Sequence, residues 1–247
     1  MKSAVRKTSR WILRAAGRMR ALIQGDRQRD IAARYLNGHG IEIGALHNPL
    51  KVPPGAGVRY VDRMSVEDLR RQYPELEHEP LTPVDIIDDG ERLSTIGDAT
   101  QDFVIANHFL EHCENPLGAL QNMLRVLKGG GVLYIAVPDK RFTFDRERPV
   151  TPFAHLSKDL IEGPQWSRRQ HYEEWATHVE KKTDHGEIER RADELMAKGY
   201  SIHFHVWSPT EMLEIFSKLD GRLNVKTDLE LFLECKEEVL AVLRKGR

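Results

Sequence analysis

The 247-residue chain contains only two cysteines, Cys113 and Cys235, and no CxxC element. Two cysteines do not build a disulfide framework, and nothing indicates a cysteine-based structural zinc site. The sequence also has no run of roughly 20 apolar residues, the length that spans a bilayer. Its start lacks an apolar stretch followed by a small-residue cleavage site. We therefore expect a cytoplasmic protein that is neither secreted nor membrane-spanning.

Acidic residues are missing from the first 20 positions, which hold seven Lys or Arg. Apolar residues recur there at near-helical spacing. Such a basic amphipathic arm would contact the anionic inner face of a membrane through residues 1–24, because each basic side chain gains about 1 kcal/mol there. The alternatives are a frayed arm or a helix docked on its own domain. The rest of the chain is net acidic, which argues against a nucleic-acid partner.

Apolar segments that alternate with helical patterns predict an α/β protein with a mostly parallel sheet and helices on both faces. The predicted strands cover residues 41–44, 58–63, 84–89, 102–107 and 131–139, with two further β-like segments at 223–227 and 237–245. The predicted helices cover residues 26–36, 66–73, 117–127 and 209–219.

The connection that follows the fifth predicted strand, residues 140–207, is far longer than the 2–6 residues usual in such units. Its sequence is charged and largely helical in pattern. Because it leaves from the edge of the sheet where ligands bind, we interpret it as a helical cap that influences substrate choice. The predicted organisation is a basic helical arm over residues 1–37 and one domain over residues 38–247 that includes this insertion.

Polar side chains follow four predicted strands at the points where the strands end. They are Glu42 with Gly44, Asp62, the pair Asp88 and Asp89, and Asn107 with His108. Parallel strand ends that carry such groups form a crevice for a nucleoside-bearing cofactor. An acid after the second strand suits ribose hydroxyls, since a carboxylate accepts two hydrogen bonds, and an acid after the third suits an adenine amino group.

With these residues, the sequence resembles the class I S-adenosylmethionine-dependent methyltransferases, and within them the bacterial methyltransferase-domain proteins of surface-glycan biosynthesis. The resemblance covers residues 38–140 and, more weakly, 205–244. It implies a Rossmann-like class I methyltransferase fold and S-adenosylmethionine as cofactor. The cofactor-binding residues that it implies are Glu42, Gly44, Ala45, Asp62, Arg63, Asp88, Asp89, Asn107 and His108.

The loop after the first strand departs from that family's usual E-x-G-x-G-x-G. Leu46 and Asn48 occupy the second and third glycine positions, and too few residues precede Val58 for a full first helix. S-adenosylmethionine has no phosphates, so glycines are less necessary than in a nucleotide loop. A second interpretation of Glu42 is a buried acid that accepts hydrogen bonds from loop amides.

The stretch "HFLEH" places His108, Glu111 and His112 on one face if it opens a helix. With His205, or with His203 of the same "HFHVW" stretch, they form a candidate site for Mg²⁺ or Mn²⁺. An E-x-x-E-H element followed by a distant His is found in the plant small-RNA terminal methyltransferases and the ubiquinone-pathway O-methyltransferases, where the bound metal holds a diol or catechol. This chain is similar, with His108 in place of the first Glu.

Two other interpretations of these histidines remain open. One of His108, His112 and His205 would act as a general base near neutral pH. Alternatively, the histidines form hydrogen bonds to backbone and have no chemical role. In the insertion, His171, Trp175 and His178 share a helical face, which is typical of packing against the main domain.

The predicted function is O-methylation of a sugar hydroxyl in a glycan or glycolipid precursor, with the sugar implied by the family resemblance alone. One alternative is a methyltransferase-like module that no longer binds cofactor and scaffolds a glycan-assembly complex. A nicotinamide-dinucleotide enzyme is disfavoured, because no G-x-G-x-x-G follows the first strand.

Overall fold

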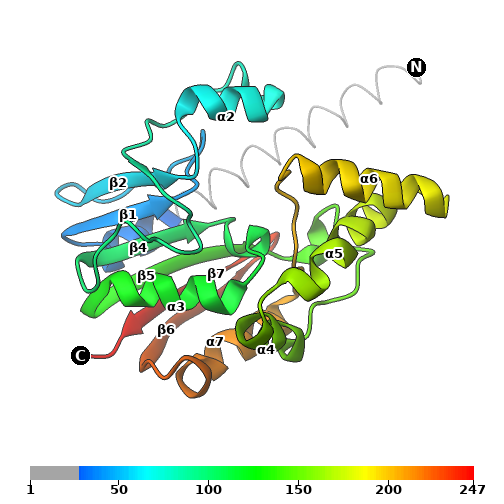
Figure 1. The fold of residues 1–247 in the computed structure, drawn as a ribbon. Helices are drawn as coiled ribbons and strands as arrows, with labels where there is room; N and C mark the ends of the chain where they lie inside the picture. The colour runs from blue at the N-terminus through cyan, green and yellow to red at the C-terminus, as the bar shows by residue number, and fades with distance from the viewer. Residues whose placement is uncertain (1–27) are drawn as a thin grey trace, which may run out of the picture.

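A seven-stranded sheet with the order β3-β2-β1-β4-β5-β7-β6 forms the centre of the computed structural model, which describes residues 28–247 (Figure 1). The first five strands are parallel, and β7 lies antiparallel between β5 and β6. The strands are β1 (His39–Ile43), β2 (Gly57–Asp62), β3 (Ile86–Ile87), β4 (Gln101–Asn107), β5 (Leu127–Pro138), β6 (Thr227–Cys235) and β7 (Glu238–Lys245). The predicted Rossmann-like α/β fold is confirmed.

Six helices follow β1 in the described part of the chain. They are α2 (Val66–Gln72), α3 (Pro116–Val126), α4 (Phe153–Glu162), α5 (Gln165–His178), α6 (His185–Ala197) and α7 (Pro209–Leu223), with 3₁₀ turns at η1 (Pro74–Leu76), η2 (Leu110–His112) and η3 (Lys140–Phe142). Residues 28–35 are also helical. The basic segment and its predicted membrane contact, residues 1–24, lie outside the described residues.

Two segments differ from the predicted strands. The third strand keeps only two of its six predicted residues, because most of residues 84–89 lack regular pairing. The predicted strand at 223–227 is wrong, since α7 continues to the buried Leu223 and ends where Asn224 adopts a left-handed conformation (φ 53°). The strand β6 begins only at Thr227.

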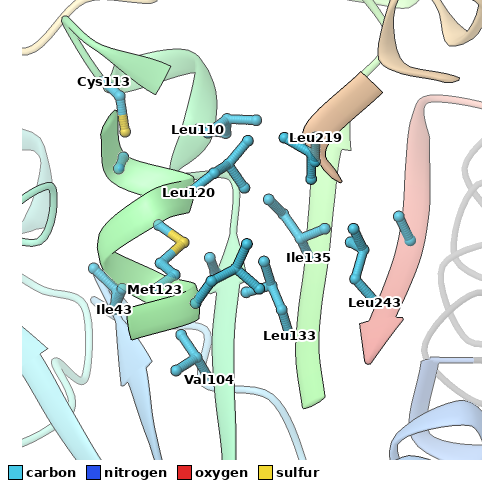
Figure 2. Close-up of a cluster of buried hydrophobic side chains, with 14 of the residues drawn as sticks. Ile43, Val104, Leu110, Cys113, Leu120, Met123, Leu133, Ile135, Leu219 and Leu243 are labelled. Atoms are coloured by element: carbon cyan, nitrogen blue, oxygen red, sulfur yellow. The ribbon is translucent and has the colours of Figure 1, made fainter. Parts of the chain in front are cut away.

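Successive residues of β5 point to opposite sides of the sheet, and those of both sides are buried. Each side of the sheet is therefore covered by helices. Leu133 and Ile135 join a buried cluster with Leu120 of α3 and Leu219 of α7 (Figure 2). The intervening Tyr134 packs on the opposite face in a second cluster, with Leu36 just beyond the helical residues 28–35. Each such fully buried side chain contributes about 1.5–3 kcal/mol, which makes β5 the centre of the core.

The helical insertion predicted after the fifth strand is present as α4, α5 and α6, beside the sheet (Figure 1). It has a small core of its own, in which Tyr172, Leu195 and Phe204 are buried together. Residues 201–207, which follow α6, return to the sheet, where Trp207 bridges Asp139 at the end of β5. Among the described residues, no helix has both the length and the apolar composition that crossing a bilayer requires.

Glu42 lies within β1 and is almost completely buried. Its carboxylate accepts a hydrogen bond from the backbone N–H of Leu50, with N···O distances of 2.9 and 3.2 Å. Burial raises its pKa to about 7, although the Leu50 amide opposes this shift. Glu42 thus fastens the loop after β1 to the sheet. This is the arrangement expected if Glu42 is a buried acid that accepts hydrogen bonds from loop amides.

Glu42→Gln is expected to change how stability depends on pH. A carboxyl group with a folded-state pKa near 7 and an unfolded value near 4.5 stabilises the fold at low pH, and this contribution is lost as the pH rises through that window. From pH 4.5 to 8, the wild-type free energy of unfolding should fall by about 3 kcal/mol relative to the variant. Urea titrations at several pH values measure this difference.

The control is Glu67→Gln, because the Glu67 side chain is 84% exposed. Its unfolding free energy should follow that of the wild type at every pH. Parallel pH curves for the wild type and Glu42→Gln would contradict the assigned burial of the Glu42 carboxyl group.

Candidate active site

The carboxyl ends of β1 to β4 border one cleft of about 750 Å³, within the range of small-molecule sites. The opposite wall comes from the insertion and the segment after α6. From the strand ends, the lining includes Gly44, Asp62, Arg63, Asp88, Asp89 and His108; from the opposite wall, it includes Arg168, Tyr172, Tyr200, Ser201 and Phe204. Five of the sequence-predicted strand-end residues, Gly44, Asp62, Asp88, Asp89 and His108, are thus brought together at the crevice expected for this sheet.

The loop after β1 makes its turn with few glycines. Gly44 has a left-handed φ of 66°, and Leu46, at the second glycine position of the related loops, also has a left-handed φ of 46°. The loop is held by hydrogen bonds from Gly44 N to Val61 O (2.9 Å) and from Asn48 N to Ala45 O (2.9 Å). The backbone therefore adopts a glycine-like conformation at Leu46. No helix follows before β2, as the short spacing predicted.

Asp62, at the end of β2, lines the cleft beside this loop. Burial raises the pKa of its carboxyl group, and hydrogen bonds from the backbone amides of Arg63 and Met64 oppose that rise. The side chain thus combines partial burial with free acceptor capacity at the cleft wall. A carboxylate in this position is suited to bind a pair of vicinal hydroxyls.

The two acids after β3 have different environments. The carboxylate of Asp88 accepts hydrogen bonds from Asp89 N (2.8 Å), Thr95 N (2.8 Å) and Thr95 Oγ1 (2.7 Å). Burial alone would raise the pKa of Asp88, but these donors together lower it. Asp89 is about half-exposed and has one oxygen 3.4 Å from the Arg92 guanidinium. Its other oxygen accepts a hydrogen bond from Glu91 N (2.9 Å). Of the two acids, the more exposed Asp89 is the one more open to a ligand.

His108 stands at the end of β4 with a left-handed φ of 49°. Its Nε2 is 2.9 Å from Glu238 Oε2, and its Nδ1 is 3.7 Å from Glu111 Oε1. Burial acts to lower the pKa of His108, but these two carboxylates together raise it. His108 is therefore favoured as a cation on the cleft wall, which makes it a poor general base.

The stretch "HFLEH" does not open an α-helix. It forms the 3₁₀ turn η2, preceded by the left-handed His108, so the predicted single helical face is wrong. Glu111 is buried, and neither of its carboxylate oxygens has a hydrogen-bond partner. His112 Nδ1 lies 3.0 Å from Ile202 O and 3.0 Å from Ser201 Oγ.

Glu111, His112 and His203 form a group, here called the cleft triad, in which one ligand atom from each lies within 4.8 Å of the others. Of the three, only His112 lines the cleft itself. Ile202 O only accepts, so His112 carries its proton on Nδ1 and keeps a lone pair on Nε2. His203 Nδ1 is 2.6 Å from Asp145 Oδ2, which fixes the same tautomer. Hydrogen bonds of this kind orient metal-binding histidines.

His205 does not belong with these residues, so the predicted set of His108, Glu111, His112 and His205 is corrected. His205 is fully buried, does not line the cleft, and lies against His155 and His171 instead. His203, two residues earlier, is the one that joins Glu111 and His112. The sequence offered both histidines, but only the path of residues 201–207 distinguishes them.

Three of the predicted cofactor contacts do not line the cleft: Glu42, Ala45 and Asn107. Glu42 is occupied by the Leu50 amide, and a role in direct cofactor contact stays a prediction for all three. Conversely, Arg168, Tyr172 and Tyr200 line the cleft without having been identified from the sequence. They come from the insertion, whose local pattern indicates helices and does not indicate which side chains reach the strand ends.

A model of the methyltransferase domain family matches residues 54–135, less than half of the chain. The chain matched none of the curated proteins with which it was compared. A solved structure from Rhodobacter sphaeroides, named for Zn-dependent alcohol dehydrogenases, shares 16% identity with a TM-score of 0.54, and 90% of each chain is covered. At that identity the likeness shows the fold alone.

Two solved S-adenosylmethionine-dependent methyltransferases are also similar. The one from Aquifex aeolicus shares 13% identity with a TM-score of 0.45 and coverage of 88% of this chain and 87% of that one. The one from Thermotoga maritima shares 15% identity with a TM-score of 0.43 and coverage of 95% and 97%. Over residues 54–135 the chain therefore matches the methyltransferase domain family, and it has the Rossmann-like fold of class I S-adenosylmethionine-dependent methyltransferases.

Proposed function

We propose that the protein transfers a methyl group from S-adenosylmethionine to a hydroxyl group of a sugar. One observation carries this proposal: Gly44, Asp62 and Asp89 converge on a single cleft whose lining also includes His108 and His112. The first three would contact an adenosyl group. His108 directly follows β4 and His112 belongs to η2, and the reacting methyl group of such a cofactor would lie near them.

The adenosyl group would be held by polar groups on two strand ends. Asp62 would accept hydrogen bonds from the ribose hydroxyls. Asp89 would accept one from the adenine amino group, because the Asp88 carboxylate is already occupied by Thr95 and by the Asp89 amide. Ile87 and Leu46 add apolar surface to the same cleft. The hydrogen bonds of Asp88 support Asp89 as the acid that would contact the adenine, of the two that the sequence offered.

Methyl transfer needs alignment and the removal of one proton. The C–S bond breaks with its electron pair going to sulfur as the acceptor oxygen bonds to the methyl carbon, so the cleft must align these atoms and exclude water. The acceptor proton would pass to His112 Nε2. Burial lowers the pKa of His112, so its imidazole is neutral at pH 7, and Ile202 O holds the other nitrogen as the donor. His112 therefore suits a general base better than His108.

The cleft triad also fits a divalent cation. The Glu111 carboxylate, which has an ion pair with His108 but no hydrogen bond, and two imidazoles with fixed tautomers offer three acceptors to a cation. A bound cation would supply Lewis acidity that lowers the pKa of an acceptor hydroxyl. Two nitrogen ligands favour Mn²⁺ over Mg²⁺, which prefers oxygen. Asp145, through its bond to His203, would keep the ligand oriented.

The sugar acceptor rests on the family resemblance, and the cleft adds modest support. The lining opposite the strand ends includes Arg168 and Tyr200, together with Tyr172, whose side chain is almost fully buried. Aromatic faces and charged donors are groups that a polyhydroxylated molecule contacts well. A glycan or glycolipid precursor is therefore the partner that we propose.

S-adenosylhomocysteine is expected to bind with micromolar affinity, and Asp62→Ala should weaken this binding by at least about tenfold, since two hydrogen bonds to a charged group are lost. Isothermal titration calorimetry measures both values. Asp228→Ala is the matched control, an exposed aspartate on β6, and should bind as the wild type does. Failure of the wild type to bind at millimolar ligand would favour the scaffold module over the enzyme.

His112→Gln should lower methyl transfer by about 10²-fold or more, because it removes the base or a metal ligand, while S-adenosylhomocysteine affinity stays near the wild-type value. The assay follows label from methyl-labelled S-adenosylmethionine into a carbohydrate extract of a strain that lacks the gene. His185→Gln, an exposed histidine on α6, is the control.

Chelation followed by Mn²⁺ addition separates the two roles of His112. Activity that falls in chelator and returns with Mn²⁺ assigns the cleft triad to a metal, and full activity in chelator assigns His112 to general base catalysis. Unchanged label transfer by His112→Gln would contradict both.

A further inference from the structure

Outside the cleft, four side chains converge in the insertion: His155 and Asp159 of α4, His171 of α5, and His205 of the segment after α6. We call them the insertion cluster. None of the four lines the cleft. His155 and Asp159 are one helical turn apart, so they share a face of α4. The cluster thus joins three parts of the chain that are far apart in the sequence.

Three separations in the insertion cluster are close to those of a tetrahedral metal site. His155 Nε2 lies 3.2 Å from His171 Nε2 and 3.4 Å from Asp159 Oδ2, and His205 Nε2 lies 3.7 Å from the same oxygen. Ligands about 2.0–2.1 Å from a tetrahedral zinc ion are separated from one another by about 3.3 Å. One ring nitrogen from each of the three histidines lies within 4.8 Å of the others.

The cluster is buried and is short of donors. Asp159 and His205 are fully buried, and Asp159 Oδ2 has no hydrogen-bond partner. The other Asp159 oxygen accepts a hydrogen bond from Ser167 Oγ at 3.2 Å. His205 Nε2 also lies 3.3 Å from Glu114 O, and a cation bound to this nitrogen would replace that hydrogen bond. A buried carboxylate oxygen without a partner and three imidazole rings thus meet where a cation would satisfy them.

We propose that His155, Asp159, His171 and His205 bind one Zn²⁺ ion as a structural site. Three imidazole nitrogens and one carboxylate oxygen are ligands that zinc accepts, whereas Ca²⁺ and Mg²⁺ require mainly oxygen. Four protein ligands leave no open coordination position, which distinguishes a structural site from a catalytic one. The partly exposed edge of His155 provides a route of entry.

The zinc ion would fasten the insertion to the cleft wall. His205 N lies 3.3 Å from Glu111 O, next to the bond of 2.8 Å from Phe204 N to the same carbonyl oxygen. A metal that binds His205 together with α4 and α5 therefore fixes both helices relative to the 3₁₀ turn that carries Glu111. The sequence predicts only that His171 packs against the main domain. On this proposal, His171 is also a metal ligand.

The experiment measures zinc in the purified full-length protein by mass spectrometry after dialysis against a weak chelator. The wild type should retain one zinc per chain. His155→Gln and Asp159→Asn should each retain at least about tenfold less, because a tetrahedral site loses a ligand. His178→Gln, on the same helix as His171, should retain the wild-type amount. Cobalt substituted for zinc should give the intense visible bands of tetrahedral Co²⁺ in the wild type and lose them in His155→Gln.

Glu111→Gln assigns the ion to the insertion cluster or to the cleft triad, and circular dichroism checks that each variant is folded. Zinc retained by Glu111→Gln and lost from folded His155→Gln supports the proposal. Zinc lost from Glu111→Gln and retained by His155→Gln would assign the metal to the cleft triad and overturn it. A wild type that retains no zinc, even after zinc is added, would also overturn the proposal. The buried Asp159 carboxylate would then be satisfied by a proton that it shares with the imidazoles.

Discussion

The buried guanidinium of Arg148 is the contact on which the geometry of the site depends. It donates to Asp145 Oδ1 (2.9 Å), His203 O (2.7 Å) and Phe204 O (3.1 Å). Burial would raise the pKa of Asp145, but hydrogen bonds from His203 and Arg148 hold it below its usual value. Removing one member of such a buried pair costs about 3–5 kcal/mol, because the other charge is left without a partner. One ion pair therefore fixes the segment of residues 201–207 against the sheet and also orients His203.

This segment connects two arrays of histidines with different surroundings. His203 reaches the cleft triad, whereas His205 reaches the insertion cluster, and Phe204 between them lines the cleft. The positions of both arrays depend on the same contacts. Arg148 donates to His203 O, and the backbone amides of Phe204 and His205 donate to Glu111 O, so these contacts fix three consecutive residues. The insertion is thus a structural extension of the cleft wall, and its helices sit beside the strand ends (Figure 1).

The parts of the fold that could be predicted from the sequence are those determined by local pattern. The apolar run of β5, the asparagine cap of α3 and the acids after β2 and β3 each signal their position through neighbouring residues. The choice between His203 and His205 could not be predicted, because it depends on contacts with Asp145 and Asp159 far along the chain. The 3₁₀ turn at "HFLEH" was not predicted either, because no local pattern indicates the left-handed backbone of His108, whose ring lies between the carboxylates of Glu111 and Glu238. The H-x-x-x-D spacing of His155 and Asp159 was the one local signal of the insertion cluster, and it gains meaning only beside His171.

The central claim is that the strand ends of β1, β2 and β3 form one adenosyl site despite a loop with few glycines. A crystal structure of the protein grown with S-adenosylhomocysteine tests it most directly. The account predicts electron density in the cleft, with the ribose hydroxyls at Asp62, the adenine amino group at Asp89 and the homocysteine sulfur toward His108. A cleft that stays empty at saturating ligand, or a ligand bound with its ribose away from Asp62, would contradict it.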